Sequence, residues 1–216
     1  MTTSRQVRLV ATVAFALAAA PGAWSQDGTL STQTPQPAFA AEVAKAEQAM
    51  NALQQALLTE LSAAMKQGGP PAAITVCHDQ AVAIADKVAR EQGIALGRTS
   101  HRLRNPANAP RPWAKAAVEQ SAGAKAASAQ RLVVDLGERV GVLRPIGTAD
   151  MCLRCHGAPD AVRQQIGSSL AASYPQDQAT GFAAGDLRGW MWAEVPKAKS
   201  AREFTVICPE SPANSR

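Results

Sequence analysis

Two cysteines and a histidine stand within five consecutive residues of this 216-residue chain, in the segment Cys152-Leu153-Arg154-Cys155-His156. This CxxCH spacing is the attachment pattern of c-type haem. The two thiols add to the vinyl groups of the porphyrin, and the imidazole binds the iron from the same side. All three side chains must therefore lie on one tight turn. Because the chain has a single CxxCH segment, we expect one covalent haem c, held by Cys152, Cys155 and His156.

Two other interpretations of the cysteine pair are a thioredoxin-like redox site and half of a zinc site. A zinc site needs four ligands, usually as two pairs, and the sequence has no second CxxC, CxxH or HxxxH. A redox CxxC should open a helix after a strand in a βαβ unit, and the pattern around residues 152–155 does not predict one. The sequence therefore favours haem attachment.

The first 25 residues have the pattern of a secretory signal peptide. Arg5 and Arg8 precede an uncharged run over residues 9–20, and a small-x-small sequence follows at 23–25. The apolar run is shorter than the ~20 residues of a stable membrane span, and no cysteine follows it to carry a lipid. We expect cleavage near Gln26, export to the periplasm and no membrane span in the mature protein. In bacteria haem is attached to CxxCH outside the cytoplasm, so the two features agree.

The remaining chain suits a single domain in size. We expect a signal peptide over residues 1–25, a flexible leader over 26–40, one folded domain over 41–208 and a loose tail over 209–216. The whole chain carries a formal charge of +5, of which two units belong to the signal region. This weak positive balance does not indicate a nucleic-acid partner.

Apolar periodicity and turn residues predict helices before strands. A helix is expected over residues 42–66, ended by Gly68-Gly69-Pro70-Pro71, and a second helix ends near Gly93 with Cys77 on its buried stripe. The other expected elements are helices over 113–131 and 159–171, strands over 94–100, 131–136, 139–146 and 185–196, and an irregular loop over 104–113. This order favours an α+β fold.

The ligand opposite His156 decides whether the iron suits electron transfer or binds small gases. Cys77 is favoured because its helical stripe faces the core, where a cofactor also lies. A Cys77–Cys208 disulfide is an equal alternative from spacing alone, because exported proteins often pair spare cysteines. The remaining candidates are two histidines and four methionines, namely His78, His101, Met50, Met65, Met151 and Met191.

The chain also resembles a known family, the exported single-haem cytochromes with a PAS-like fold. The resemblance spans roughly residues 42–196 and rests on GRTSHRLRNPANAP (97–110), Pro145-Ile146, CLRCHG and YPQDQATGFAAGDLRG (174–189). It implies an antiparallel PAS-like sheet flanked by helices, with long N-terminal helices, and an axial pair of His156 and Cys77. In the family, acidic residues and Trp-Glu tend to follow this loop. This chain departs from that pattern, because it continues with Arg111-Pro112-Trp113-Ala114.

Three arginines, Arg98, Arg102 and Arg104, lie in or beside that loop. Arginine suits bidentate recognition of carboxylates, so the cluster is a candidate for binding haem propionates. For Arg102 we prefer solvation or bonding to local carbonyl groups. Asn105 and Asn108 are expected to hold the proline-containing turns through bonds from side chain to backbone.

These features together predict a periplasmic haem-binding protein that senses redox state or a small ligand and has no enzymatic reaction of its own. The alternative is an electron-transfer cytochrome, which keeps both axial ligands in both redox states and docks a redox partner protein. A peroxidase-like enzyme is disfavoured, because no distal His-Arg arrangement can be placed beside an open iron site.

Overall fold

The computed structural model describes residues 38–198, all within the unit that begins at Pro37. The expected signal peptide, almost all of the leader, Cys208 and the tail lie outside these residues, and the expected domain boundaries stay predictions. Within residues 38–198, no helix combines the length and the hydropathy that crossing a bilayer requires.

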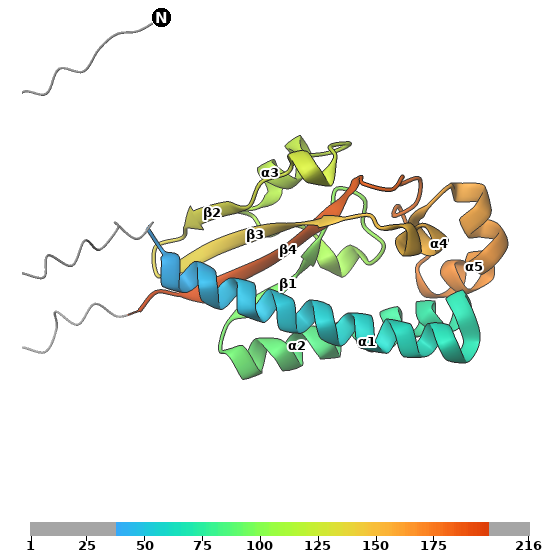
Figure 1. Cartoon of the computed structure of the whole chain (residues 1–216), viewed down its shortest axis with the longest axis horizontal. Coiled ribbons are helices and arrows are strands. Elements are labelled where there is room, and N and C mark those ends of the chain that lie inside the picture. The colour runs from blue at the N-terminus through green and yellow to red at the C-terminus, as the bar shows by residue number, and fades with distance from the viewer. Residues whose placement is uncertain (1–37, 199–216) are drawn as a thin grey trace, which may run out of the picture. The chain divides into compact units, whose positions relative to one another are not determined.

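A four-stranded antiparallel sheet forms the centre of this unit, in the order β1-β4-β3-β2 (Figure 1). The strands are β1 (Ala95–Thr99), β2 (Leu132–Asp135), β3 (Arg139–Gly147) and β4 (Leu187–Pro196). The long β3 and β4 are bordered by the short β2 and β1. The predicted strands and the α+β class with an antiparallel sheet are confirmed.

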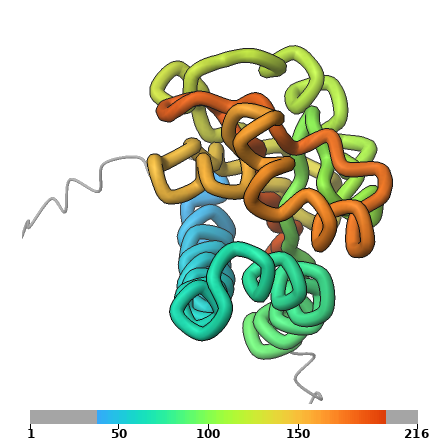
Figure 2. Tube along the Cα trace, turned by 90° about the vertical axis from the view of Figure 1, so that its right-hand side faces the viewer, coloured from blue at the N-terminus to red at the C-terminus, as the bar shows by residue number. Residues whose placement is uncertain are grey.

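Two helices cover one face of the sheet, α1 (Ala40–Asp79) and α2 (Ala81–Gln92). Figure 2 shows them side by side below the sheet. α1 is two helices joined by a kink at Gly68 and Gly69, where Gly69 adopts a φ of 67°. The predicted end of the first helix is thus confirmed at the kink. The second predicted helix is interrupted at Gln80, and Gly93 closes α2 in the left-handed region (φ 61°).

The two faces of the sheet bury different residues, because side chains alternate along a strand. The face under α1 and α2 packs against small and aliphatic side chains of the two helices, such as Ala46, Leu53 and Val88. The opposite face carries Trp190 and Trp192, which pack with the short helix α3 (Lys115–Gln120). We call this second face the tryptophan face.

The helix predicted over residues 113–131 is wrong for most of its length. The structure forms α3 (Lys115–Gln120) and a single 3-10 turn, η2 (Ala126–Ser128). Gly123 adopts a φ of 77°, which breaks the helix after α3. An antiparallel bridge then ties Lys125 to Asp186, just before β4. Tertiary pairing therefore overrides the helical propensity of this alanine-rich segment.

Past the end of β3, the chain forms a 3-10 turn η3 (Asp150–Cys152), helix α4 (Leu153–His156) and helix α5 (Pro159–Ser173). α4 and α5 lie beyond one end of the sheet (Figure 1). α5 confirms the short helix predicted over 159–171 and packs on the second half of α1, where Ile74 is buried against Val162 and Ile166. This end of the molecule is called the site end below.

Candidate functional site

The CxxCH segment folds as the single turn that its chemistry needs. Cys152 ends η3, and α4 carries Cys155 and His156. The turn closes with a bond from Gly157 N to Leu153 O at 2.9 Å. A Cβ atom at position 157 would lie 2.5 Å from Leu153 O, so this position accepts only glycine. The glycine after the histidine is therefore part of the local geometry.

The His156 side chain is half-buried, and one bond to the backbone holds its ring. Its Nδ1 atom donates to the carbonyl oxygen of Ala179 at 2.7 Å. Burial lowers the pKa of His156 well below its usual value, and the charges of Arg188 and Arg104 act in the same direction. The ring is therefore neutral at neutral pH with its proton on Nδ1, which leaves Nε2 as the metal-binding atom.

A loop after α5 folds back over α4 and supplies this contact. Phe182 N donates to His156 O at 3.0 Å, and Gly181 N donates to Gly157 O at 2.7 Å. The Phe182 ring meets the His156 ring edge to face, with ring centroids 6.4 Å apart. Sequence reasoning did not assign roles to Ala179 and Phe182. Their one signal was that they fall within the segment 174–189 that supported the family resemblance.

Arg104 joins three parts of the site end through bonds that use most of its donors. It pairs with Asp177 at 3.1 Å, and the two side chains are only 10% and 7% exposed. Its Nη2 atom also donates to Cys155 O at 2.5 Å and to Ala179 O at 3.4 Å. Arg104 therefore positions the cysteine turn relative to the loop that orients His156.

Cys77 lies near the end of α1, half-buried and without a disulfide partner among residues 38–198. Burial raises its pKa, and the positive charges of Arg98 and Arg104 oppose that effect. The pKa of Cys155 is raised by burial as well, and the charge of Cys77 adds to its shift. Ile74, one turn before Cys77, packs in the cluster that includes Cys155. The structure therefore brings Cys77 to the side of α4 that carries the CxxCH motif.

The four methionine candidates differ in how deeply they are buried. Met50 and Met191 belong to the core between the sheet and its helices and are 0% and 2% exposed. Met151 is 54% exposed on the outer side of the cysteine turn, and Met65 is half-buried on α1. Met50 and Met191 are thus structural core residues.

The two other histidines are placed differently from Cys77. His78 is exposed, with Nδ1 2.7 Å from an oxygen of Asp79, and lines a small pocket of about 150 Å³ with Asn105 and Tyr174. His101 packs edge to face on Phe182, with centroids 5.8 Å apart. His101 therefore sits on the same phenylalanine as His156.

Arg102 donates from Nη1 to Thr180 O at 2.8 Å, which is a carbonyl group far along the sequence and not a local one as expected. Asn105 is confirmed as a turn residue, since its side chain accepts from Ala107 N at 2.9 Å. For Asn108, no comparable side-chain bond occurs within residues 38–198.

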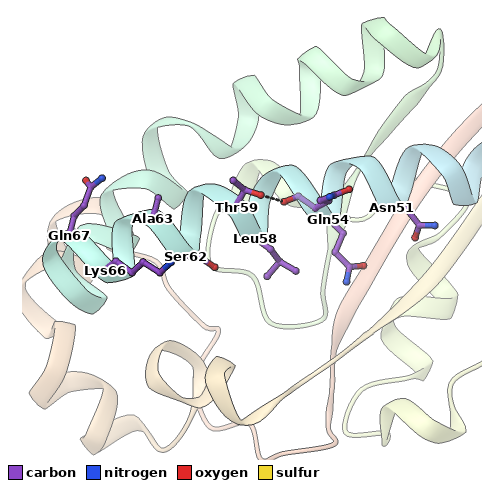
Figure 3. Close-up of a pocket in the computed structure, with 9 residues that line it drawn as sticks. Asn51, Gln54, Leu58, Thr59, Ser62, Ala63, Lys66 and Gln67 are labelled. Carbon is purple, nitrogen blue, oxygen red and sulfur yellow. Dashed lines mark hydrogen bonds between the residues drawn. The ribbon is translucent and has the colours of Figure 1, made fainter.

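A larger groove of about 790 Å³ runs along α1, away from this chemistry. Figure 3 shows its lining side chains along one side of the helix, including Gln54, Leu58 and Lys66. None of the predicted site residues lines it. We therefore place the candidate site at α4 and not in this groove.

The residues at the site end fit a c-type haem. The donor set is one neutral imidazole and one thiol, beside two further thiols on a single turn. Arg188 Nε and His101 Nδ1 are buried there without a hydrogen-bond partner among the described residues. No three side chains of His, Cys, Asp or Glu gather as a metal-ion site within residues 38–198, so the described part holds no group suited to the zinc alternative.

Comparison with known proteins agrees with this geometry. No curated protein matches the chain. Among solved structures, the crystal structure of the cyanobacterial heme-protein Tll0287 is similar, at 26% sequence identity and a TM-score of 0.56, over 75% of this chain and 99% of that chain. The Tll0287-like family matches residues 34–196, which is well over half of the sequence and confirms the resemblance seen there. The chain therefore belongs to the Tll0287-like family.

Proposed function

We propose that this protein carries one covalently attached haem c, with His156 and Cys77 as the axial ligands. Cys152 and Cys155 form the two thioether bonds. The observation that carries the proposal is the bond from His156 Nδ1 to Ala179 O at 2.7 Å, which leaves Nε2 to bind iron next to the two cysteines. The similarity to a heme-protein over 99% of that protein's chain supports it.

The haem supplies a one-electron redox couple and, where an axial position opens, a place for a small gas to bind. The protein keeps His156 neutral, because burial lowers its pKa. It also favours the protonated form of Cys77, because burial raises the pKa of that thiol. As an iron ligand Cys77 would bind as a thiolate, and the burial that raises its pKa would favour uptake of a proton at Sγ once that bond is lost.

This behaviour suits a sensor of redox state or of a small ligand. Release of Cys77 from the iron would change the contacts at the end of α1, and a partner protein would respond to that change. The protein acts in the periplasm after removal of residues 1–25 and has no enzymatic reaction of its own. Its export is tested by N-terminal sequencing of periplasmic protein, which we expect to begin near Gln26.

Electron transfer is the second candidate function, and one observation favours it. Met151, next to Cys152, is 54% exposed, so haem attached at this turn lies close to the protein surface. A surface-exposed haem edge suits exchange of electrons with a docked redox protein. In this case both axial ligands stay bound in both redox states.

The test uses periplasmic protein of the wild type and of the double variant Cys152→Ala with Cys155→Ala. Haem that stays with the wild-type chain under denaturing conditions, and is lost from the variant, is the expected result. An absence of chain-bound haem from the wild type would reject the proposal.

Carbon monoxide then separates the two functions. Binding of carbon monoxide to the reduced wild-type protein is expected for a sensor that releases Cys77. Low-spin spectra in both redox states without carbon monoxide binding would instead establish the fixed ligand pair of an electron carrier.

A further inference from the structure

Besides the exposed Arg154 within the CxxCH turn, four arginines lie around the candidate site, and their hydrogen bonds divide them into two pairs. Arg104 is engaged by Asp177 and by two carbonyl oxygens. Arg102 donates to Thr180 O and lies over the Phe182 ring, 5.0 Å from its centroid. These two arginines hold the loops of the site end in place. Their guanidinium groups are therefore already bonded to protein groups.

Arg98 is different, because it enters a buried region without an acidic partner. It stands on β1 opposite Met191 of β4, and directly opposed residues share one face of a sheet. Met191 is part of the core under α1, so Arg98 points to the same side. Within residues 38–198, Arg98 forms no ion pair. Burial lowers its pKa, and the ionised forms of Cys77 and Tyr174 would act against that shift.

Arg188, at the start of β4, is only partly engaged. Its Nη1 atom donates to Ser100 Oγ at 3.1 Å and to Arg102 O at 3.4 Å. Its Nε atom is buried and has no partner among the described residues. Burial lowers the pKa of Arg188 to about 10, and the charges of Arg104 and Arg98 contribute to the shift. Its guanidinium also lies over Phe182, the ring that packs on His156.

Two half-buried guanidinium groups without carboxylate partners are unfavourable by themselves, because even partial desolvation of a charge is repaid only by pairing. A haem brings two propionate groups, and a guanidinium binds a carboxylate through paired N–H donors. Arg98 lies near Cys77 and Arg188 near His156, which are the two proposed axial ligands. Both arginines are therefore candidates to meet the anionic groups of a cofactor that Cys77 and His156 would hold.

We propose that Arg98 and Arg188 bind the propionates of the haem, whereas Arg102 and Arg104 hold the protein scaffold around it. This inference rests on the haem proposed above and assigns the anionic end of its site. Of the three arginines that the sequence offered for binding propionates, only Arg98 keeps this role. Arg102 and Arg104 are structural, and Arg188 is a propionate ligand that the sequence did not indicate.

The test measures the reduction potential of holoprotein against pH for the variants Arg98→Gln and Arg188→Gln. Loss of either positive charge leaves a propionate uncompensated, which stabilises ferric iron. We expect the equilibrium constant for reduction to fall about tenfold, equivalent to about 59 mV for a one-electron couple. The freed propionate also gains a higher pKa, so the potential acquires a further pH dependence between about pH 5 and 8, beyond any that the wild type shows, and rises more steeply as the pH falls.

The matched control is Arg102→Gln, which removes the same charge from the same cluster. We expect a smaller shift of its potential and no new pH dependence. The variants Arg98→Lys and Arg188→Lys keep the charge and are expected to restore a potential near that of the wild type, which distinguishes lost pairing from local misfolding. Potentials of the two glutamine variants that match Arg102→Gln at every pH would overturn the assignment. A wild-type protein without bound haem would instead reject the proposed function itself.

Discussion

The tryptophan face and the site end differ in how their buried charged and polar groups are paired. On the tryptophan face, the buried Glu194 accepts bonds from Arg111 Nε at 2.8 Å and from Trp113 Nε1 at 2.9 Å. At the site end, buried donors of Arg188 and His101 have no partner among the described residues. The charge of Glu194 is paired by protein groups, although the Thr99 hydroxyl opposite Trp190 is buried without a partner, whereas at the site end a cationic side chain keeps an unpaired donor. Unpaired donors of buried cationic side chains therefore identify the functional end of the sheet better than apolar patterning does.

The largest expected effect is at the cysteine turn. The double variant Cys152→Ala with Cys155→Ala should lose all covalent haem and, with it, the stability that the cofactor adds to the site end. Haem staining after denaturing electrophoresis and thermal unfolding measure the two effects. An unchanged unfolding temperature would mean that the site end is complete without its cofactor.

The next largest effect is expected at Arg104. Its replacement by Gln leaves Asp177 as an unpaired buried charge and should lower the free energy of unfolding by ~3–5 kcal/mol. Urea denaturation of the holoprotein measures this loss. The exposed Arg163 is the control, because its pair with Asp160 is a surface pair, and Arg163→Gln should cost ~0–1 kcal/mol. Similar losses in both variants would refute the structural role given to Arg104.

A substitution in the core of the tryptophan face should lower the stability of the protein without changing the haem site. Leu143 is fully buried there, and Leu143→Ala should lower the free energy of unfolding by about 3 kcal/mol. The haem spectrum should stay that of the wild type, because the substitution lies on the opposite side of the sheet from Cys77 and Arg98. An altered spectrum would show that the two regions are coupled through the sheet.

The smallest effect concerns Glu194. Burial by itself raises the pKa of Glu194, but the bonds from Arg111 and Trp113 outweigh it and hold that pKa below the usual value. The lowered pKa contributes stability above the unfolded-state value of about 4.3, and this contribution disappears as the pH falls through the folded-state pKa. Unfolding followed below about pH 5 should therefore show a shallower decline for Glu194→Gln than for the wild type.

A second substitution checks the same network at neutral pH. Arg111→Gln should cost ~1–2 kcal/mol, since Trp113 remains as a donor to Glu194 and Arg111 is half-exposed. A loss as large as that of Arg104→Gln would contradict the difference between the two regions.

Local features of the sequence could be predicted, and features that depend on tertiary placement could not. The kink at Gly68 and the turn that carries His156 follow from residues a few positions apart. The helix expected over 113–131 failed because pairing to the residues before β4 overrides its propensity. The roles of Ala179 and Arg188 depend on a loop and a strand that meet the CxxCH turn only in the folded chain.

The central claim is that Cys77 is the second axial ligand, and electron paramagnetic resonance of ferric holoprotein tests it most directly. The wild type and Cys208→Ala should share one low-spin thiolate signal, whereas Cys77→Ala should lose it and show a changed optical spectrum. Equal changes in Cys77→Ala and Cys208→Ala would contradict the account and favour a disulfide between these two cysteines.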